Sequence, residues 1–479
     1  MKIRNTHQSH YTLLFEPVMN HKGNVQLIDH SQDRKSKIRL TIKDIDFGYR
    51  VQQEFPSIIA DLIDLAVAIH VADRLSVPDL RKKQTQIDVV LPVRHPELLN
   101  ATSFQNQLTS LLEWTTGSKW LFEFQKRLNS GRIVEQQPLF SSADRHVDRV
   151  ALWSGGLDAL AGLYTQLQRG DEESFMLFGS GSSNNVYARQ EKVFQAIKSY
   201  FPNRLNLCRI PIRLSDSNQN KKNKYSRTRG VVFSLLGAAC AYLMGQRTLH
   251  LYENGIGAIN LPYRKSAIGL DHSRSVHPLT LLKVSELVSE LIGEEFKVEN
   301  PFLFWTKAEM CQALAEDKRN DLVSLTMSCD CPHRQQPIQC GYCSSCILRK
   351  QALAASTMED PTQYIVPHGK KPKADTDLYL QNMLMQVSTL RGLLDVSDNP
   401  KMQWKSLTKR FVELDDIVDR TARLENLQAT EMQKSLIRLY QTYVEEWETV
   451  KLQILADLSC SNQQKSDHPL VGFLKGKMP

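Results

Sequence analysis

The sequence predicts an α/β protein whose core is a doubly wound parallel sheet, flanked by an α+β N-terminal region and a helical C-terminal extension. Three observations support this. Strand and helix patterns alternate regularly from about residue 148, five of the nine cysteines crowd into residues 329–346, and helical periodicity prevails after about residue 370. Because 479 residues exceed what one ordinary core holds, we expect a multidomain chain.

Four apolar strands and three helices are expected in the core. Such alternation is typical of parallel strands joined by crossover helices. Gly170 and Gly245 stand where the terminal glycine of a helix is usual. The expected strands span 148–153, 174–179, 205–212 and 247–253, and the expected helices span 158–168, 186–201 and 230–245.

The flanks carry clear periodicity but no motif with evident chemistry. Strand alternation at 37–42 and 87–93 surrounds an amphipathic helix at 56–75. Apolar stripes at 378–394 and 431–455 pack on the core or bind a partner. The expected domains are an α+β N-terminal domain (1–145), the α/β core (148–325), the cysteine cluster (326–360) and the helical extension (365–479).

Composition narrows the class of protein. With 41% apolar and 23% charged residues, and without a run of 18 apolar residues, the chain resembles a soluble globular protein and not a membrane protein. No secretory signal opens the chain, so we expect it in the cytoplasm. The net charge of +8 favours anionic small molecules, but is too diffuse for a nucleic-acid partner.

The stretch WSGGLDAL, residues 153–160, joins the first core strand to a helix. A glycine-rich turn there leaves unpaired main-chain amides at the positive end of the helix, which suits a phosphate group. Gly155 and Gly156 let the main chain approach phosphate oxygens, Ser154 offers a hydroxyl donor, and Asp158 could hold the loop or Mg²⁺. The sequence therefore predicts an anion-binding turn without the lysine of a Walker motif.

This run resembles the SGGxDS loop of the PP-loop (HUP-like) ATP pyrophosphatases, which split ATP into AMP and pyrophosphate to adenylate a substrate. The closing serine of that pattern is Ala159 here, so one hydroxyl contact to phosphate is missing. The resemblance implies ATP contacts from Trp153, Ser154, Gly155, Gly156, Leu157, Asp158, Phe178 and Arg229.

The second signal is a group of cysteines. Cys340, Cys343 and Cys346 follow two C-x-x-C spacings, which suit three corners of a tetrahedral zinc site. A fourth ligand could come from Cys329 or Cys331, or less readily from His333. Four thiolates would close the site to water, so we expect structural and not catalytic zinc; unligated buried thiols are the alternative.

A PP-loop followed by C-G-x-C-x-x-C-x-x-R resembles the 7-cyano-7-deazaguanine synthase (QueC) family. The family's Ser-Cys pair matches Ser328-Cys329 and favours Cys329 as the fourth ligand, although the spacer to Cys340 is longer here. The resemblance also places Arg229 near the phosphates as a catalytic residue beside Asp158, although Gly230 replaces an asparagine. Arg229 could instead belong to a solvated basic loop.

Substrate contacts are expected from Glu253 and Asn260. Asn260 stands where the family has a substrate-reading aspartate, and Glu253 could supply the carboxylate that guanine-like N–H donors prefer. The alternative for Glu253 is a structural acid. The family's Tyr-Pro-Asp stretch is replaced by LPYRKS. His272 and His277 are further acid–base candidates, although a loop histidine is more often polar surface.

The resemblance implies a ligase that uses ATP and Mg²⁺ to adenylate a 7-deazaguanine carboxylate and then forms an amide or nitrile with ammonia. ENGIGAINLP and the long flanks resemble the QatC-type proteins of anti-phage operons, which implies a protein amine from a partner as acceptor. Rival interpretations are a nucleotide-binding scaffold or sensor without turnover, a tRNA-thiolating PP-loop enzyme, and a zinc-ribbon nucleic-acid module. The amine and a homo-oligomeric state stay open.

Overall fold

The structure is a computed structural model. None of the helices in the part of the chain that it describes is both long and apolar enough to cross a membrane. It describes residues 9–19, 21–48, 55–77, 85–127, 131–132, 135, 147–170, 172–181, 184–215, 223, 226–262, 274–330, 338–365, 378–422, 425 and 427–460.

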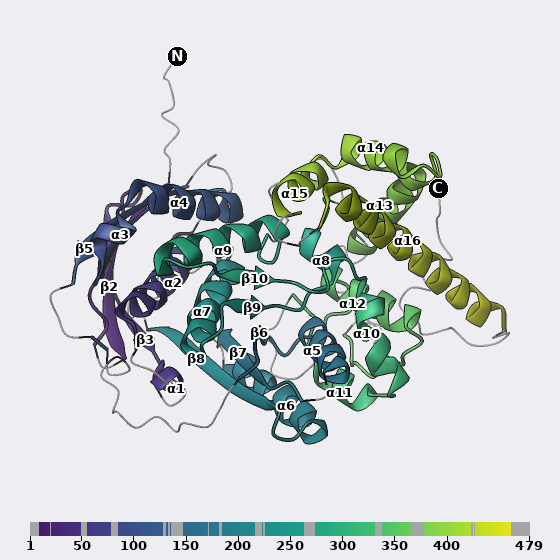
Figure 1. The fold of residues 1–479 in the computed structure, drawn as a ribbon, viewed down its shortest axis with the longest axis horizontal. Coiled ribbons are helices and arrows are strands. Elements are labelled where there is room, and N and C mark those ends of the chain that lie inside the picture. Colours follow the sequence, from purple (N-terminus) through teal and green to yellow (C-terminus); the bar gives the residue numbers. More distant parts are fainter. Residues whose placement is uncertain are drawn as a thin grey trace, which may run out of the picture.

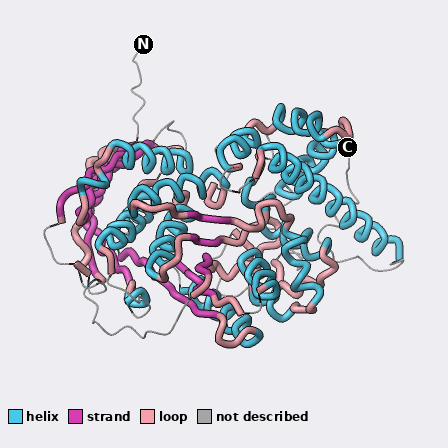
Figure 2. Tube along the Cα trace, viewed as in Figure 1, coloured by secondary structure: helices cyan, strands magenta, loops and turns pink. Residues whose placement is uncertain are grey.

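Ten strands form one mixed, mostly parallel sheet (Figures 1 and 2), in the order β10-β9-β6-β7-β8-β3-β2-β1-β4-β5. The parallel core strands confirm the predicted α/β class. Their bounds are β6 Arg149–Leu152, β7 Phe175–Gly181, β8 Leu205–Ser215, β9 Thr248–His250 and β10 Lys297–Glu299. Those of the N-terminal strands are β1 Ser9–Phe15, β2 Lys22–Asp29, β3 Arg34–Ile42, β4 Thr85–Val93 and β5 Lys119–Lys126.

Helices cover both faces of the core strands. Successive side chains of a strand point to opposite faces, so Val150 and Leu152 join one apolar cluster while Ala151 and Trp153 join the other. The first cluster contains α2 (Ser57–Leu75), α4 (Thr102–Thr116), α7 (Arg229–Leu243) and α9 (Pro278–Ile292). The second contains α5 (Leu157–Arg169), α6 (Asn184–Tyr200), α10 (Lys307–Glu316) and α11 (Asn320–Leu325).

The N-terminal strands continue the core sheet. β3 pairs antiparallel with β8, with Ile42 opposite Ile212. On the far side of β3, β2 pairs antiparallel with both β3 and β1, and β1, β4 and β5 run parallel. The short helices α1 (Ile45–Gly48) and α3 (Pro96–Leu99) follow β3 and β4.

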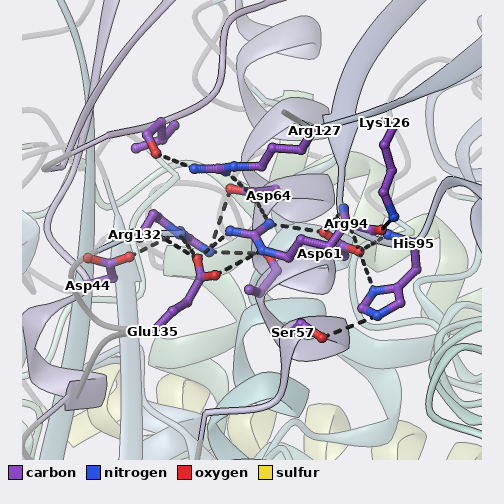
Figure 3. Close-up of polar contacts among 12 residues, drawn as sticks. Asp44, Ser57, Asp61, Asp64, Arg94, His95, Lys126, Arg127, Arg132 and Glu135 are labelled. Atoms are coloured by element: carbon purple, nitrogen blue, oxygen red, sulfur yellow. Dashed lines mark hydrogen bonds and ion pairs between the residues drawn. The ribbon is translucent and has the colours of Figure 1, made fainter. Parts of the chain in front are cut away.

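A buried ionic network joins the N-terminal elements (Figure 3). Arg94, just after β4, pairs with Asp61 of α2 at 3.0 Å and Asp64 of α2 at 2.6 Å, and also with Glu135. Arg132 pairs with Asp44 at 3.0 Å, and both side chains are fully buried. Because an unpaired buried charge is costly, the network holds these segments in one arrangement.

The C-terminal helices pack together around their own apolar cluster, which also contains residues of α8 and α9. α8 (Gly255–Ile259) and α12 (Ser344–Ala355) both contact α16, which lies beside them in Figure 1. The other helices of this region are α13 (Leu378–Leu394), α14 (Pro400–Arg410), α15 (Glu413–Thr421) and α16 (Ala429–Cys460).

Candidate active site

The glycine turn connects β6 to the N-terminus of α5. Gly155 has φ +70°, and a Cβ there would lie 3.2 Å from the main chain of Gln190. Gly156 is the N-cap of α5, and a Cβ there would lie 3.1 Å from Oγ of Ser154 and 3.4 Å from the carbonyl oxygen of Met327. Gly155 therefore requires glycine because its φ is positive and the main chain of Gln190 lies close, while Gly156 leaves room for the Ser154 hydroxyl and the carbonyl oxygen of Met327.

The first turn of α5 has no side-chain cap. Among the residues that the structure describes, the amide of Gly156 donates to the exposed Ser154 hydroxyl at 3.1 Å. The first amides of a helix have no partner within the helix and carry its positive end. This geometry is that of an anion cradle.

The apolar residues of the predicted ATP set lie in the core. Trp153, Leu157 and Phe178 are fully buried, and the Trp153 indole donates to the carbonyl oxygen of Gln190 at 3.0 Å. Phe178 stacks on Phe47. Because these three side chains are buried, only their main-chain atoms could contact a nucleotide. Their role in ATP binding stays a prediction.

Four polar residues meet at the start of α5. The Asp158 carboxylate accepts from the ammonium of Lys307 at 2.5 Å and from the side-chain amide of Asn254 at 2.9 Å. That same amide donates to the Glu253 carboxyl at 2.8 Å. The structure thus brings the predicted Asp158 and Glu253 together through Asn254, while Lys307 neutralises one of the two acids.

The charge states in this group follow from burial and from the close acids. Burial raises the pKa of Glu253 to about 8, and the negative charge of Asp158 adds to the rise. Burial alone would lower the pKa of Lys307, but the charges of Asp158 and Glu253 outweigh it and raise that pKa above its ordinary value. At neutral pH the group therefore holds an ammonium, a carboxylate and a protonated acid.

Lys307 and Asn254 were absent from the sequence-based set. Thr306 and Glu309 form a capping box at the start of α10, with both reciprocal hydrogen bonds present. That four-residue pattern is visible in the sequence and marks Lys307 as the first residue of a helix. Asn254 is fully buried and caps α8, accepting from the amide of Gly257 at 2.8 Å.

Arg229 is the first residue of α7, and its side chain keeps exposed surface. Surrounding protein lowers its pKa from the ordinary value. Within the described residues, no hydrogen bond or ion pair joins Arg229 to the glycine turn. The neighbouring Arg227 instead pairs with the fully buried Asp73 of α2 at 3.1 Å.

The remaining candidates are Asn260 for substrate binding and the two histidines for acid–base chemistry. Asn260 adopts φ +50° and ends α8, partly exposed. His277 is buried and not surface, and its ring accepts from the amide of Leu279 at 3.2 Å as the N-cap of α9. Burial and then Arg274 lower the pKa of His277 to about 3, which makes it a neutral structural group. His272 lies outside the described residues.

The segment that leads into the cysteine cluster lies beside the glycine turn, since the carbonyl oxygen of Met327, two residues before Cys329, approaches Gly156. The sulfur atoms of Cys329, Cys340, Cys343 and Cys346 all lie within 4.8 Å of one another, and all four residues are buried. The amide of Cys340 donates to the Cys329 sulfur at 3.4 Å, and the amide of Cys343 to the Cys340 sulfur at 3.3 Å.

This donor set fits zinc. Cysteine ligates zinc as the thiolate, and main-chain amides already donate to the sulfur atoms of Cys329 and Cys340, which favours that form. Four sulfur donors leave no open position for water, as in structural zinc sites. The competing candidates Cys331 and His333 lie outside the described residues.

Comparison with known proteins finds a match that includes part of this site. Residues 275–357, which contain Lys307 and all four clustered cysteines, match the family model "Queuosine biosynthesis protein QueC". This part of the chain is similar to the QueC family. A 7-cyano-7-deazaguanine synthase of Coxiella burnetii (strain RSA 493 / Nine Mile phase I) is 37% identical over 76 residues, which cover 15% of this chain and 31% of that protein.

Two longer alignments have lower identity. The 7-cyano-7-deazaguanine synthase of Rickettsia felis is 23% identical over 238 residues, covering 45% of this chain and 98% of that protein. The one from Magnetococcus marinus is 26% identical over 234 residues, covering 46% of this chain and 97% of that protein. The QueC-like part thus accounts for less than half of the chain.

Two residues that depart from the QueC pattern, Ala159 and Gly230, lie in closely packed surroundings. Ala159 is buried in the apolar cluster around α5. At Gly230, a Cβ would overlap the main chain of Ser275. Glycine at this position therefore follows from how the segment before α9 packs on α7.

Proposed function

We propose that this QueC-like protein uses ATP to adenylate a 7-deazaguanine carboxylate and then joins the activated acyl group to an amine. The observation that carries the proposal is the uncapped start of α5 next to the Asp158–Lys307 pair and Glu253. The turn would bind phosphate oxygens through main-chain amides. Buried acids beyond it would face the substrate.

The proposed reaction has two steps. An oxygen of the substrate carboxylate attacks the α-phosphorus of ATP, and pyrophosphate leaves against the amides of the turn and the ammonium of Lys307. The amine nitrogen then attacks the acyl carbon, AMP leaves, and an amide forms. Adenylation is required because a carboxylate oxygen is a poor leaving group.

Each polar residue has a distinct part in this proposal. Lys307 and Arg229 would balance the negative charge on the departing pyrophosphate. Asp158 would hold Mg²⁺, whose positive charge would offset the negative charge of the phosphates. Glu253 would accept from the N–H donors of the deazaguanine ring; because its pKa is about 8 in the free protein, such binding would release a proton near neutral pH. Asn260 would contact the ring as well.

The acceptor amine and the biological role extend the proposal. Resemblance to the QatC-type proteins favours a protein amine from a partner over ammonia, and a role in anti-phage defence. The long flanks would provide surface for such a partner. The thiolates of a zinc site would persist in a reducing compartment such as the cytoplasm.

The test is pyrophosphate release from ATP and Mg²⁺, with and without 7-carboxy-7-deazaguanine. We expect release that depends on the acid, and intact-mass analysis with ammonia or candidate proteins then identifies the acceptor. Lys307→Met should lower kcat by about 10²–10³-fold. The control is Lys192→Met, an exposed lysine of α6. ATP binding without acid-dependent release would overturn the proposal and leave a nucleotide-binding scaffold.

A further inference from the structure

The C-terminal helix α16 contacts the turn that carries Lys307. The hydroxyl of Thr306, which caps α10, donates to the Glu446 carboxylate on α16. Gln351 of α12 donates to the other oxygen of that carboxylate at 3.0 Å. Glu446 therefore binds the residue directly before Lys307, and Lys307 in turn contacts Asp158.

A second residue of α16 binds the same turn on both sides of Thr306. The Arg438 guanidinium pairs with Glu309 at 2.6 Å and also donates to the carbonyl oxygen of Phe304. Glu309 is the far member of the capping box that begins at Thr306. Arg438 and Glu446 thus hold the 304–309 turn at three points: Arg438 binds Glu309 and the carbonyl oxygen of Phe304, and Glu446 binds the hydroxyl of Thr306.

The same helix packs against the turn that carries Glu253 and Asn254. A Cβ at Gly255 would lie 2.6 Å from a methyl group of Leu439 and would overlap the carbonyl oxygen of Leu303. The amide of Gly255 donates to the carbonyl oxygen of Trp305 at 2.8 Å. The two turns are therefore bonded to each other, and α16 covers both.

We infer that α16 is a built-in support of the active site and that Glu446 is a positioning residue, which holds Lys307 against Asp158 by fixing Thr306. This inference rests on the proposed function for its catalytic meaning. It gives the C-terminal extension a role within the reaction, because α16, which lies outside the matched residues 275–357, packs against both turns. Glu446 touches neither the ATP site nor Lys307 and acts through the cap.

The first test compares variants of two adjacent glutamates on α16. Glu446→Ala should lower the single-turnover rate of pyrophosphate release about tenfold, because a displaced lysine stabilises the leaving group less well. Glu446→Gln keeps an oxygen that can accept from Thr306 and should stay within about threefold of the wild type. Glu445→Ala removes the same side chain at the adjacent, exposed position and is the control.

A double-mutant cycle separates positioning from general stability. In a Lys307→Gln background, Glu446→Ala should have little further effect, below about twofold, because the residue through which it acts is gone. A loss as large as in the wild-type background would overturn the inference. So would full activity of a folded Glu446→Ala protein.

Hydrogen–deuterium exchange provides a measurement independent of turnover. Glu446→Ala should speed exchange at residues 253–257 and 304–309 relative to Glu445→Ala, because the support of both turns is lost. Absence of pyrophosphate release by the wild type would reject the proposed function alone, and faster exchange at both turns would still support the positioning role. Unchanged exchange there would reject that role in either case.

Discussion

At the scale of single residues, Gly230 shows how a departure from a family pattern can have a packing cause. In the sequence, loss of the asparagine suggests a weakened phosphate site. In the structure, the main chain of Ser275 occupies the space that any side chain would need. The glycine is therefore explained by packing and is no evidence for lost turnover.

Gly230→Ala should consequently destabilise the protein. The added methyl group must push Ser275 away, and overpacking of this kind costs about 1–3 kcal/mol. Gly392→Ala is the matched control, because a Cβ there meets no atom within 4 Å in helix α13. It should raise the free energy of unfolding by about 0.5–1 kcal/mol. Thermal unfolding of the two variants checks both signs, and equal stabilities would contradict the packing explanation.

Glu253 gives the protein a predicted pH dependence. Its pKa is about 8 in the folded state against an ordinary 4.5, so the folded state holds the extra proton between those values. The stabilisation that Glu253 contributes to the folded state is thus fully present below about pH 4.5 and is lost as the pH rises through 8. Glu253→Gln, which cannot ionise, should have a higher Tm than the wild type at pH 9, with the gap closing towards pH 5.

Asp158→Asn provides the comparison for that pH series. Removing the negative charge beside Glu253 takes away one cause of its raised pKa. The Asp158→Asn variant should therefore lose less stability than the wild type as the pH rises from 5 to 9. If the difference between Glu253→Gln and wild type were the same at pH 5 and pH 9, the assignment of the proton to Glu253 would be wrong.

The sequence predicts part of this residue group, for a physical reason. Asp158 and Glu253 each stand just beyond a core strand, and parallel strands bring such positions to one edge of the sheet. Lys307 lies more than fifty residues further along the chain and reaches the site only because α10 packs against α5. No local pattern encodes that contact, although its capping box is readable.

At the scale of elements, the cysteine cluster combines a turn with a helix N-terminus. Cys343 is the N-cap of α12, and Cys346 lies in its first turn. Local spacing predicts three ligands, since two C-x-x-C steps suffice. Cys329 arrives from another segment, and its selection over Cys331 comes from the resemblance and agrees with the described cluster.

Metal analysis of the purified protein should find about one zinc ion per chain. Cys343→Ser should lose that zinc and unfold at lower temperature, because metal binding energy contributes directly to folding. Cys208→Ser is the control, since Cys208 is a buried cysteine of β8 outside the cluster. It should keep the zinc. Full zinc content in Cys343→Ser would show that the cluster is not the ligand set.

Elements were easier to predict than their pairing. The predicted core strands and helices agree with β6 to β9 and α5 to α7, because period and turn residues are local signals. The pairing of β3 with β8 joins residues 39–42 to residues 212–215, and such a contact leaves no trace in local periodicity. The sequence therefore predicts the N-terminal strands as part of a separate α+β domain.

At the scale of the whole molecule, α2 connects the N-terminal region to the start of α7. The Asp73 carboxylate of α2 accepts from the amide of Thr228 at 3.1 Å and from the hydroxyl of Ser226 at 2.9 Å, and it pairs with Arg227. Asp73 is fully buried. A residue of the first 145 thus completes the N-terminus of a core helix, next to Arg229.

Asp73→Ala should therefore destabilise both regions together. It removes the carboxylate that pairs with Arg227 and leaves the buried amide of Thr228 without its acceptor, and an unsatisfied buried donor costs about 1–3 kcal/mol. Because the two regions share the sheet and this carboxylate, calorimetry should show one transition displaced to lower temperature. Glu97→Ala, at an exposed position of α3, should change stability by less than about 0.5 kcal/mol. A new early transition with the remaining melt unchanged would instead show that the N-terminal region folds as an independent unit, and α2 would then be a docked neighbour of α7.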